Sequence, residues 1–210
     1  MTHTSTPRIW LRAESKPGEA RAALAPPHAK TLVDRGYAVV VEDCPQRVFP
    51  VSEYEAAGCQ IAANGGWPAA PADSFILGLK ELPEDGRPLT HTHIYFAHAF
   101  KKQAGWTELL GRFADGGGSL LDLEYLVDGN GRRLAAFGHW AGFTGAALGV
   151  LNWCRQRRGL TPGLSSLAPW TDSSALVADC RQAVQEAMLG DARTPALIVI
   201  GAGGRVGGGA

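Results

Sequence analysis

The sequence predicts an α/β fold, in which a Rossmann-like parallel sheet is connected by helical crossovers. Along the first half of the chain, short β-rich runs alternate with helical stretches, which is the order that parallel sheets require. Two central runs, residues 74–79 and 94–97, are continuously apolar and are interpreted as buried strands. A final apolar run followed by a glycine-rich stretch indicates the beginning of a second, nucleotide-binding Rossmann domain.

The first elements follow from turn and capping signals. A helix should begin near Pro26-Pro27 and stop at Gly36, because proline favours the first helical turn and glycine the residue past the last one. A densely charged loop, residues 12–21, precedes this helix. In order, we expect a strand at 9–11, the helix from 26 to 36, a strand at 37–41, a short helix at 51–58 and a short strand at 61–63.

The second half of the chain is expected to begin with a helix and a strand and to continue through two long helices. Residues 171–174, Thr-Asp-Ser-Ser, are typical of a helix N-cap. The expected elements are a helix at 106–113, a strand at 120–126, an apolar run at 134–137, helices at 141–158 and 174–189, and a strand at 195–200. We therefore predict a substrate-side domain at residues 1–137, and connecting helices with the start of an NAD-binding domain at 138–210.

Composition excludes several classes of partner. Twenty basic residues balance twenty acidic ones without a block of like charge, so nothing favours nucleic acid or a membrane surface, and a small molecule is the expected partner. The N-terminal residues lack an apolar signal core, which predicts a cytoplasmic protein. Four scattered cysteines without a CxxC pair predict free thiols.

Lys80 and His98 are the principal candidates for catalysis. Each follows one of the two central apolar runs, so both should lie at the C-terminal edge of the sheet if those strands are neighbours. A desolvated lysine and a histidine can both exchange protons near neutral pH and could share acid–base work. The alternative is a strand-end lysine in solvent and a histidine satisfied within the core.

Asp122 and Glu124 are expected on one face of a strand, where they could steady a cation in a cleft or simply face solvent. Arg132 and Arg133 follow a turn, and at most one of them should reach a given site because adjacent strand residues point to opposite faces.

Glycines mark two further features. Gly142, Gly145 and Gly149 make one smooth face of the 141–158 helix, which predicts close approach of a backbone, either within the chain or across a subunit boundary. Residues 201–210 follow an apolar run, as in a dinucleotide loop, although the usual glycine spacing is not met. A flexible tail is the alternative. The following helix and the acidic residue for the ribose are missing, so the chain looks truncated.

Seven segments together resemble the lysine-forming, NAD-dependent saccharopine dehydrogenases. The N-terminal half is also similar to the more distant alanine dehydrogenase and transhydrogenase N-terminal domains. Val206 and the glycines after it depart from the family's loop. The matching segments are Arg12–Leu24, Gly78–Glu81, Phe96–His98, Gln103–Trp106, Asp122–Glu124, Gly131–Arg133 and Gly201–Arg205.

The resemblance implies NAD-dependent oxidative cleavage of saccharopine to lysine and 2-oxoglutarate. It implies that Lys80 takes the proton of the secondary amine and that His98 is the acid–base group in hydrolysis. The remaining roles implied by resemblance are substrate contacts for Arg21, Gln103, Arg133 and Phe137, dinucleotide contacts for Arg132, Gly201, Gly204 and Arg205, and tuning of the site by Lys16, Glu81 and Glu124.

Two other functions remain open at this point: a non-catalytic binding or regulatory module, and an alanine-dehydrogenase-like enzyme. His91 and His93 would lie on one face of a strand, but no Cys or carboxylate ligand stands near them at a familiar spacing. No metal is therefore expected.

Overall fold

The computed structural model describes residues 6–160, 167–189 and 196–210. The chain divides into two compact units, Met1–Ala135 and Ala136–Ala210. None of the described helices is long and apolar enough to cross a membrane.

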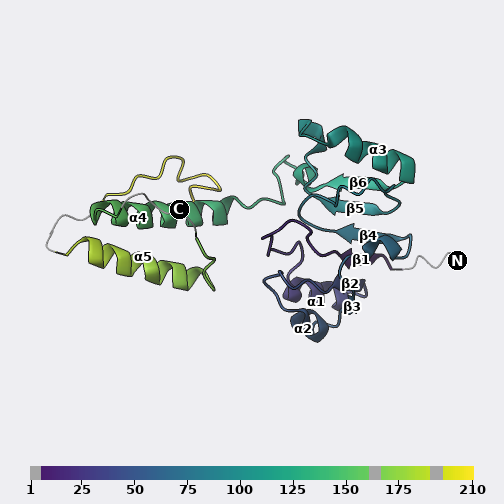
Figure 1. The fold of residues 1–210 in the computed structure, drawn as a ribbon, viewed down its shortest axis with the longest axis horizontal. Coiled ribbons are helices and arrows are strands. Elements are labelled where there is room, and N and C mark those ends of the chain that lie inside the picture. Colours follow the sequence, from purple (N-terminus) through teal and green to yellow (C-terminus); the bar gives the residue numbers. More distant parts are fainter. Residues whose placement is uncertain (1–5, 161–166, 190–195) are drawn as a thin grey trace. The chain divides into compact units, whose positions relative to one another are not determined.

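The described part of the first unit contains a parallel sheet, which confirms the predicted fold class. The strand order is β3-β2-β1-β4-β5-β6, and every neighbouring pair is parallel. Figure 1 shows α1 and α2 beside the β2–β3 side of the sheet and α3 beside β6. The strands are β1 (Arg8–Leu11), β2 (Ala38–Glu42), β3 (Gln60–Ala62), β4 (Ser74–Leu77), β5 (Thr92–Tyr95) and β6 (Ser119–Asp122), and the helices are α1 (Pro26–Asp34), α2 (Val51–Ala56) and α3 (Trp106–Gly116).

The strand order reverses direction beside β1. The chain runs outward from β1 to β3 and then returns to the other side of β1 to form β4. In open α/β sheets, ligands bind at the carboxyl ends of the strands where such a reversal occurs. Leu77 at the end of β4 is level with Leu11 of β1 and Ile94 of β5, so the segments that follow these strands meet at one edge.

Alternate residues of the strands bury two separate apolar clusters, because successive side chains point to opposite faces of a sheet. Leu11 and Val41 belong to a cluster with Ala29 and Tyr54, and Leu77 packs against it. The other cluster consists of Trp67, Ala70, Ile76, Leu82, Leu89, Tyr95 and Phe113. This burial on both faces explains why the central runs are apolar without alternation.

The predicted strand at 120–126 is wrong beyond Asp122. Leu123–Tyr125 form a turn of 3-10 helix, labelled η3. The cause is local, because Asp122 Oδ1 accepts the backbone N–H of Glu124 at 3.0 Å and turns the chain away from the strand direction. Asp122 and Glu124 therefore do not share one face of a strand.

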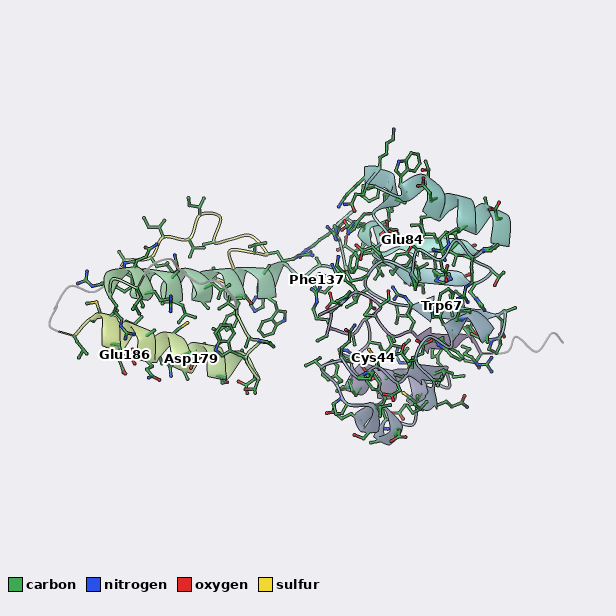
Figure 2. The ribbon with its side chains drawn as sticks, in the orientation of Figure 1. Cys44, Trp67, Glu84, Phe137, Asp179 and Glu186 are labelled. Carbon is green, nitrogen blue, oxygen red and sulfur yellow. The ribbon has the colours of Figure 1, made fainter. Side chains whose placement is uncertain are left out.

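The second unit contains α4 (Gly138–Arg157) and α5 (Ser173–Ala187), which pack against each other. The predicted cap of α5 is confirmed, since Asp172 accepts the N–H of Ala175 at 2.9 Å. Figure 2 labels Asp179 and Glu186 on α5; Asp179 accepts from the Trp170 indole at 2.6 Å, and Glu186 pairs with an arginine at the end of α4.

Only one of the three glycines predicted to permit backbone approach on α4 does so. A Cβ at Gly142 would overlap the carbonyl of Val206, so close packing occurs within the chain at this position. A Cβ at Gly145 or Gly149 would have no described atom within 4 Å.

The predicted strand at 195–200 is wrong for the residues that can be judged. Residue 195 lies outside the described ranges, residues 196–199 have no regular structure, and Ile200 enters a series of turns. A strand needs a neighbour to receive its hydrogen bonds, and none of the described strands pairs with this segment. Ile198 and Ile200 are accordingly 85% and 95% exposed.

Candidate active site

Charged residues gather where β1, β4 and β5 end. Arg12 directly follows β1, Lys80 lies shortly after β4, and His98 lies shortly after β5. The backbones of the last two segments are joined, because Phe96 N–H donates to the Leu79 carbonyl at 3.3 Å. This confirms that Lys80 and His98 follow neighbouring parallel strands. No hydrogen bond or ion pair among the described residues links their side chains.

A buried ion pair lies at the reversal point of the sheet. Arg12 Nη1 is 3.4 Å from Glu14 Oε2, and the two side chains are 1% and 4% exposed. The Arg12 guanidinium also lies 5.8 Å from the centre of the Tyr95 ring. Burial lowers the pKa of Arg12, and the neighbouring Glu14 carboxylate raises it in part. Two desolvated charges of opposite sign are therefore held together beside the candidate site.

This ion pair holds the backbone that carries Lys80. Glu14 Oε1 accepts the N–H of Leu79 at 2.7 Å, and Glu14 Oε2 accepts the N–H of Lys80 at 3.0 Å. The Lys80 carbonyl accepts from Arg12 Nη2. The side chain of Lys80 is half-buried, and its ammonium makes no hydrogen bond or ion pair within the described parts of the chain.

The charge of Lys80 acts on two nearby carboxylates, those of Glu81 and Glu19. Glu81, the next residue, lies 3.5 Å from Lys16 through Oε2 and Nζ. A hydrogen bond from its own backbone amide lowers the pKa of Glu81, and the charges of Lys16 and Lys80 lower it further. Glu19 is also close enough for Lys80 to lower its pKa, although the larger cause is its hydrogen bond with Arg21.

Arg21 is held by a fork of hydrogen bonds. Its Nε and Nη2 donate to the two carboxylate oxygens of Glu19 at 2.7 and 2.5 Å. The Glu19 side chain is 8% exposed, whereas that of Arg21 is 54% exposed. The guanidinium is therefore oriented by a buried partner while much of it faces solvent, as a binding residue for a carboxylate should be.

His98 has an unusual backbone conformation. Its φ of 52° is left-handed, a region that non-glycine residues seldom adopt. Asp122 Oδ2 accepts the His98 N–H at 2.9 Å, and the ring stacks on Phe96. The side chain is 26% exposed, so His98 is neither a core histidine nor a solvated one.

Glu124 links three basic side chains. Its carboxylate is 3.3 Å from His98 Nδ1, 3.6 Å from Lys101 Nζ and 2.9 Å from Arg133 Nη1. The Glu124 side chain is 10% exposed. Of the two adjacent arginines, Arg133 thus reaches this cluster, whereas Arg132 is bonded through its backbone to Asp128.

Of the predicted residues not yet described, Gln103 belongs to the first unit and the others to the second. Gln103 is exposed, and its carbonyl accepts the N–H of Trp106 at 3.1 Å. Phe137, the residue before α4, lies in the second unit and is labelled in Figure 2. The predicted dinucleotide residues Gly201, Gly204 and Arg205 also belong to the second unit.

The glycine-rich segment is a coil of turns. Gly201 has a φ of 78° and its carbonyl accepts the N–H of Gly204 at 2.8 Å. Arg205 packs on Gly138 of α4, where an added Cβ would lie 3.0 Å from the arginine Cγ.

His91 and His93 are buried, with ring centres 6.4 Å apart. His91 Nε2 lies 3.0 Å from the Ala70 carbonyl, and His93 is enclosed by Trp67 and Phe113. Within the described residues, no group of three or more His, Cys, Asp or Glu side chains has the arrangement of a metal site.

Sequence reasoning missed four residues of this site: Arg12, Glu14, Glu19 and Lys101. The first three stand in a charged loop, which by composition is expected to face solvent. Arg12 and Glu14 are two residues apart immediately after a buried strand, so they extend one face of that strand. This alternate spacing was the sequence feature from which the burial of Arg12 and Glu14 could have been predicted.

The chain is similar in sequence to known dehydrogenases. A saccharopine dehydrogenase [NAD(+), L-lysine-forming] of Emericella nidulans is 48% identical over 208 residues, covering 97% of this chain and 55% of the relative. The enzyme of the same name from Candida glabrata is 47% identical over 204 residues, covering 96% of this chain and 55% of the relative. The chain thus spans about half the length of the curated relatives it matches.

A solved structure of an L-alanine dehydrogenase has the same fold, with a TM-score of 0.51 and 15% sequence identity. The match covers 84% of this chain and 52% of that structure. The family model described as "Alanine dehydrogenase/PNT, N-terminal domain" matches residues 10–144. The matched range includes strands β2 to β6 and the charged residues around Lys80 and around Glu124. The chain belongs to the family of the alanine dehydrogenase/PNT N-terminal domain.

Proposed function

We propose that this chain supplies the proton-transfer and carboxylate-binding half of an NAD-dependent enzyme that cleaves saccharopine oxidatively to lysine and 2-oxoglutarate. The observation that supports this most strongly is the 47–48% identity to saccharopine dehydrogenases over nearly the whole chain. A second supporting observation is that Lys80 and His98 follow neighbouring strands, next to the reversal point of the sheet.

In this reaction a hydride leaves the carbon next to the secondary amine of saccharopine, the amine proton is lost, and an imine forms. Lys80, in its neutral form, accepts that proton. The lysine ammonium that results is stabilised by the nearby carboxylates of Glu19 and Glu81, whose charges already interact with Lys80.

His98 serves in the hydrolysis that follows. Water adds to the imine and gives a carbinolamine, which then collapses to the free amine and the keto acid. At Nδ1, His98 lies 3.3 Å from a Glu124 oxygen and 3.4 Å from Lys101 Nζ, so a carboxylate and an ammonium hold this side of the ring, and we assign proton exchange with water to Nε2. The arrangement of imidazole and carboxylate suits general acid–base catalysis.

Arg21 and Arg133 are proposed to bind carboxylates of the substrate. Saccharopine has three carboxylates, and a guanidinium offers paired donors in a fixed plane. Each arginine is oriented by a largely buried glutamate, Glu19 or Glu124, and remains about half exposed. Gln103 and Phe137 are proposed as further substrate contacts on the resemblance alone.

NAD, the cofactor of the relatives, would accept the hydride. The described residues fit only part of its site: Gly201 allows a left-handed turn, but residues 196–200 do not form a strand. The proposed dinucleotide contacts of Arg132, Gly201, Gly204 and Arg205 therefore carry no step of the reaction here.

The test is the formation of NADH from saccharopine and NAD, followed by absorbance. The "completed enzyme" for this assay joins residues 1–210 to the part of the Candida glabrata relative that lies beyond its matched segment. We expect turnover by the completed enzyme and none by residues 1–210 alone. A completed enzyme that is folded and binds NAD but does not turn over saccharopine would refute the assignment of saccharopine as the substrate. Turnover by residues 1–210 alone would refute the proposal that this chain supplies only half of the enzyme.

A further inference from the structure

Lys80 lies just beyond the hydrogen-bonded end of β4, so the sheet ladder does not by itself fix its backbone. Strand β4 ends at Leu77. Beyond it, Gly78 N–H donates to the Ile94 carbonyl at 3.0 Å and the Leu79 carbonyl accepts from Phe96 N–H at 3.3 Å, but neither bond engages Lys80. Lysine has a long side chain with four rotatable bonds, and the position of its nitrogen depends on where the backbone directs the first of them.

Two side chains from the segment after β1 replace the missing ladder. The N–H of Leu79 and the N–H of Lys80 donate to the two oxygens of Glu14 at 2.7 and 3.0 Å, and the Lys80 carbonyl accepts from Arg12. With the Leu79 carbonyl bonded to Phe96 N–H, all four backbone polar groups of Leu79 and Lys80 are engaged.

The glycine at position 78 makes the contact between Arg12 and the end of β4 possible. A Cβ at Gly78 would overlap Nε, Cζ and Nη2 of Arg12, so glycine is required for the guanidinium to lie across the end of β4. The Tyr95 ring of β5 supports the guanidinium 5.8 Å from its centre. Three adjacent strands thus contribute to the fixation of one residue.

We propose that Glu14, with Arg12, is the positioning residue for Lys80: it acts on turnover only by fixing the backbone of that lysine. The proposal rests on the proposed function for its kinetic consequence, but the contacts themselves can be tested without any activity. Neither side chain reaches the substrate, because both are at least 96% buried.

The first experiment measures amide hydrogen exchange by NMR in residues 1–210. The amides of Leu79 and Lys80 should exchange as slowly as those of β4, although they lie outside the strand. Glu14→Gln should speed their exchange, because an amide offers one acceptor oxygen where the carboxylate offers two. Glu19→Gln is the matched control: the Glu19 side chain is 8% exposed and accepts its hydrogen bonds from Arg21, none from residues 12–14 or 78–80, so it should leave the ratio of Lys80 to β4 protection unchanged.

The second experiment is a double-mutant cycle in the completed enzyme. Glu14→Gln should lower kcat at least ~10-fold with KM changed less than ~2-fold, since misplacement of a catalytic group acts in the transition state. In a Lys80→Met background the same change should have little further effect on kcat, because its target is gone. An equal loss in both backgrounds would mean a merely structural role and overturn the proposal.

Gly78→Ala provides a second route if Glu14→Gln does not fold. It displaces Arg12 without removing either charge, and it should lower kcat in the same Lys80-dependent way. Rapid exchange of the Lys80 amide in the unmutated chain would overturn the proposal without any variant. Slow exchange in a completed enzyme that does not turn over saccharopine would instead leave the contacts intact and refute the proposed function.

Discussion

Acidification should destabilise the first unit through His93. This side chain has no exposed surface, lies between Trp67 and Phe113, and has neither ring nitrogen hydrogen-bonded within the described residues. Burial, together with a smaller contribution from the charge of Arg12, lowers the pKa of His93 from 6.5 to about 3. The folded protein therefore keeps the ring neutral at pH values at which the unfolded chain protonates it.

The sign and size of the effect follow from linkage. Because the pKa of His93 is depressed on folding, the unfolded state binds the extra proton, and stability is lost as pH falls from 6.5 towards 3. Each unit of pH in this window removes about 1.4 kcal/mol, so the free energy of unfolding should fall by about 2 kcal/mol between pH 6.5 and pH 5 from this residue alone.

The assay is urea unfolding of residues 1–210, followed by NMR signals of β4 and β5 so that only the first unit reports. The comparison is with His93→Leu, which fills the same apolar space without a titrating group and retains the contributions of the other histidines. We expect the unmutated protein to lose about 2 kcal/mol more than the variant on going to pH 5. Equal losses, or an imidazole signal of His93 that titrates near pH 6, would refute this explanation.

Three further outcomes are expected. Glu42→Gln should lower the free energy of unfolding by about 2–6 kcal/mol in urea titrations, because two buried donors lose their acceptor at about 1–3 kcal/mol each; a loss below 1 kcal/mol would contradict it. Gly116→Ala should destabilise by about 1–3 kcal/mol, because its Cβ would overlap the backbone of Leu89, whereas Gly111→Ala in the same helix, with open space around it, should stabilise by up to about 1 kcal/mol; equal effects of the two would contradict the packing. Protein purified without a histidine tag should contain no stoichiometric zinc by elemental analysis, since the imidazoles of His91 and His93 are enclosed in the core; one zinc per chain would refute this.

The sequence was sufficient for the parts of the fold that depend on local pattern. Continuous apolar runs indicated β4 and β5, and the ionisable residues after them, Lys80 and His98, do lie at one edge of a parallel sheet. These predictions hold because a strand buried on both faces appears in the sequence as a continuous apolar run, and because helical stretches between such runs indicate a parallel sheet.

The parts that failed depend on contacts between distant segments. The alternate spacing of Arg12 and Glu14 hints at their burial, but the contact of the Arg12 guanidinium with Gly78, more than sixty residues away, leaves no local pattern. Asp122 ends β6 early through a side-chain hydrogen bond that competes with the ladder. An apolar run at 196–200 has strand-like composition, but composition cannot supply a neighbouring strand.

The most direct test of the proposed site is the separation of kcat from KM in variants of the completed enzyme. Lys80→Met and His98→Gln should each lower kcat by ~10²- to 10⁴-fold, because general acid–base groups act mainly in the transition state. Arg133→Ala should chiefly raise the KM for saccharopine, as the loss of a carboxylate anchor does. Near-normal turnover of Lys80→Met or His98→Gln from pH 6 to pH 10 would contradict the catalytic assignment of that residue.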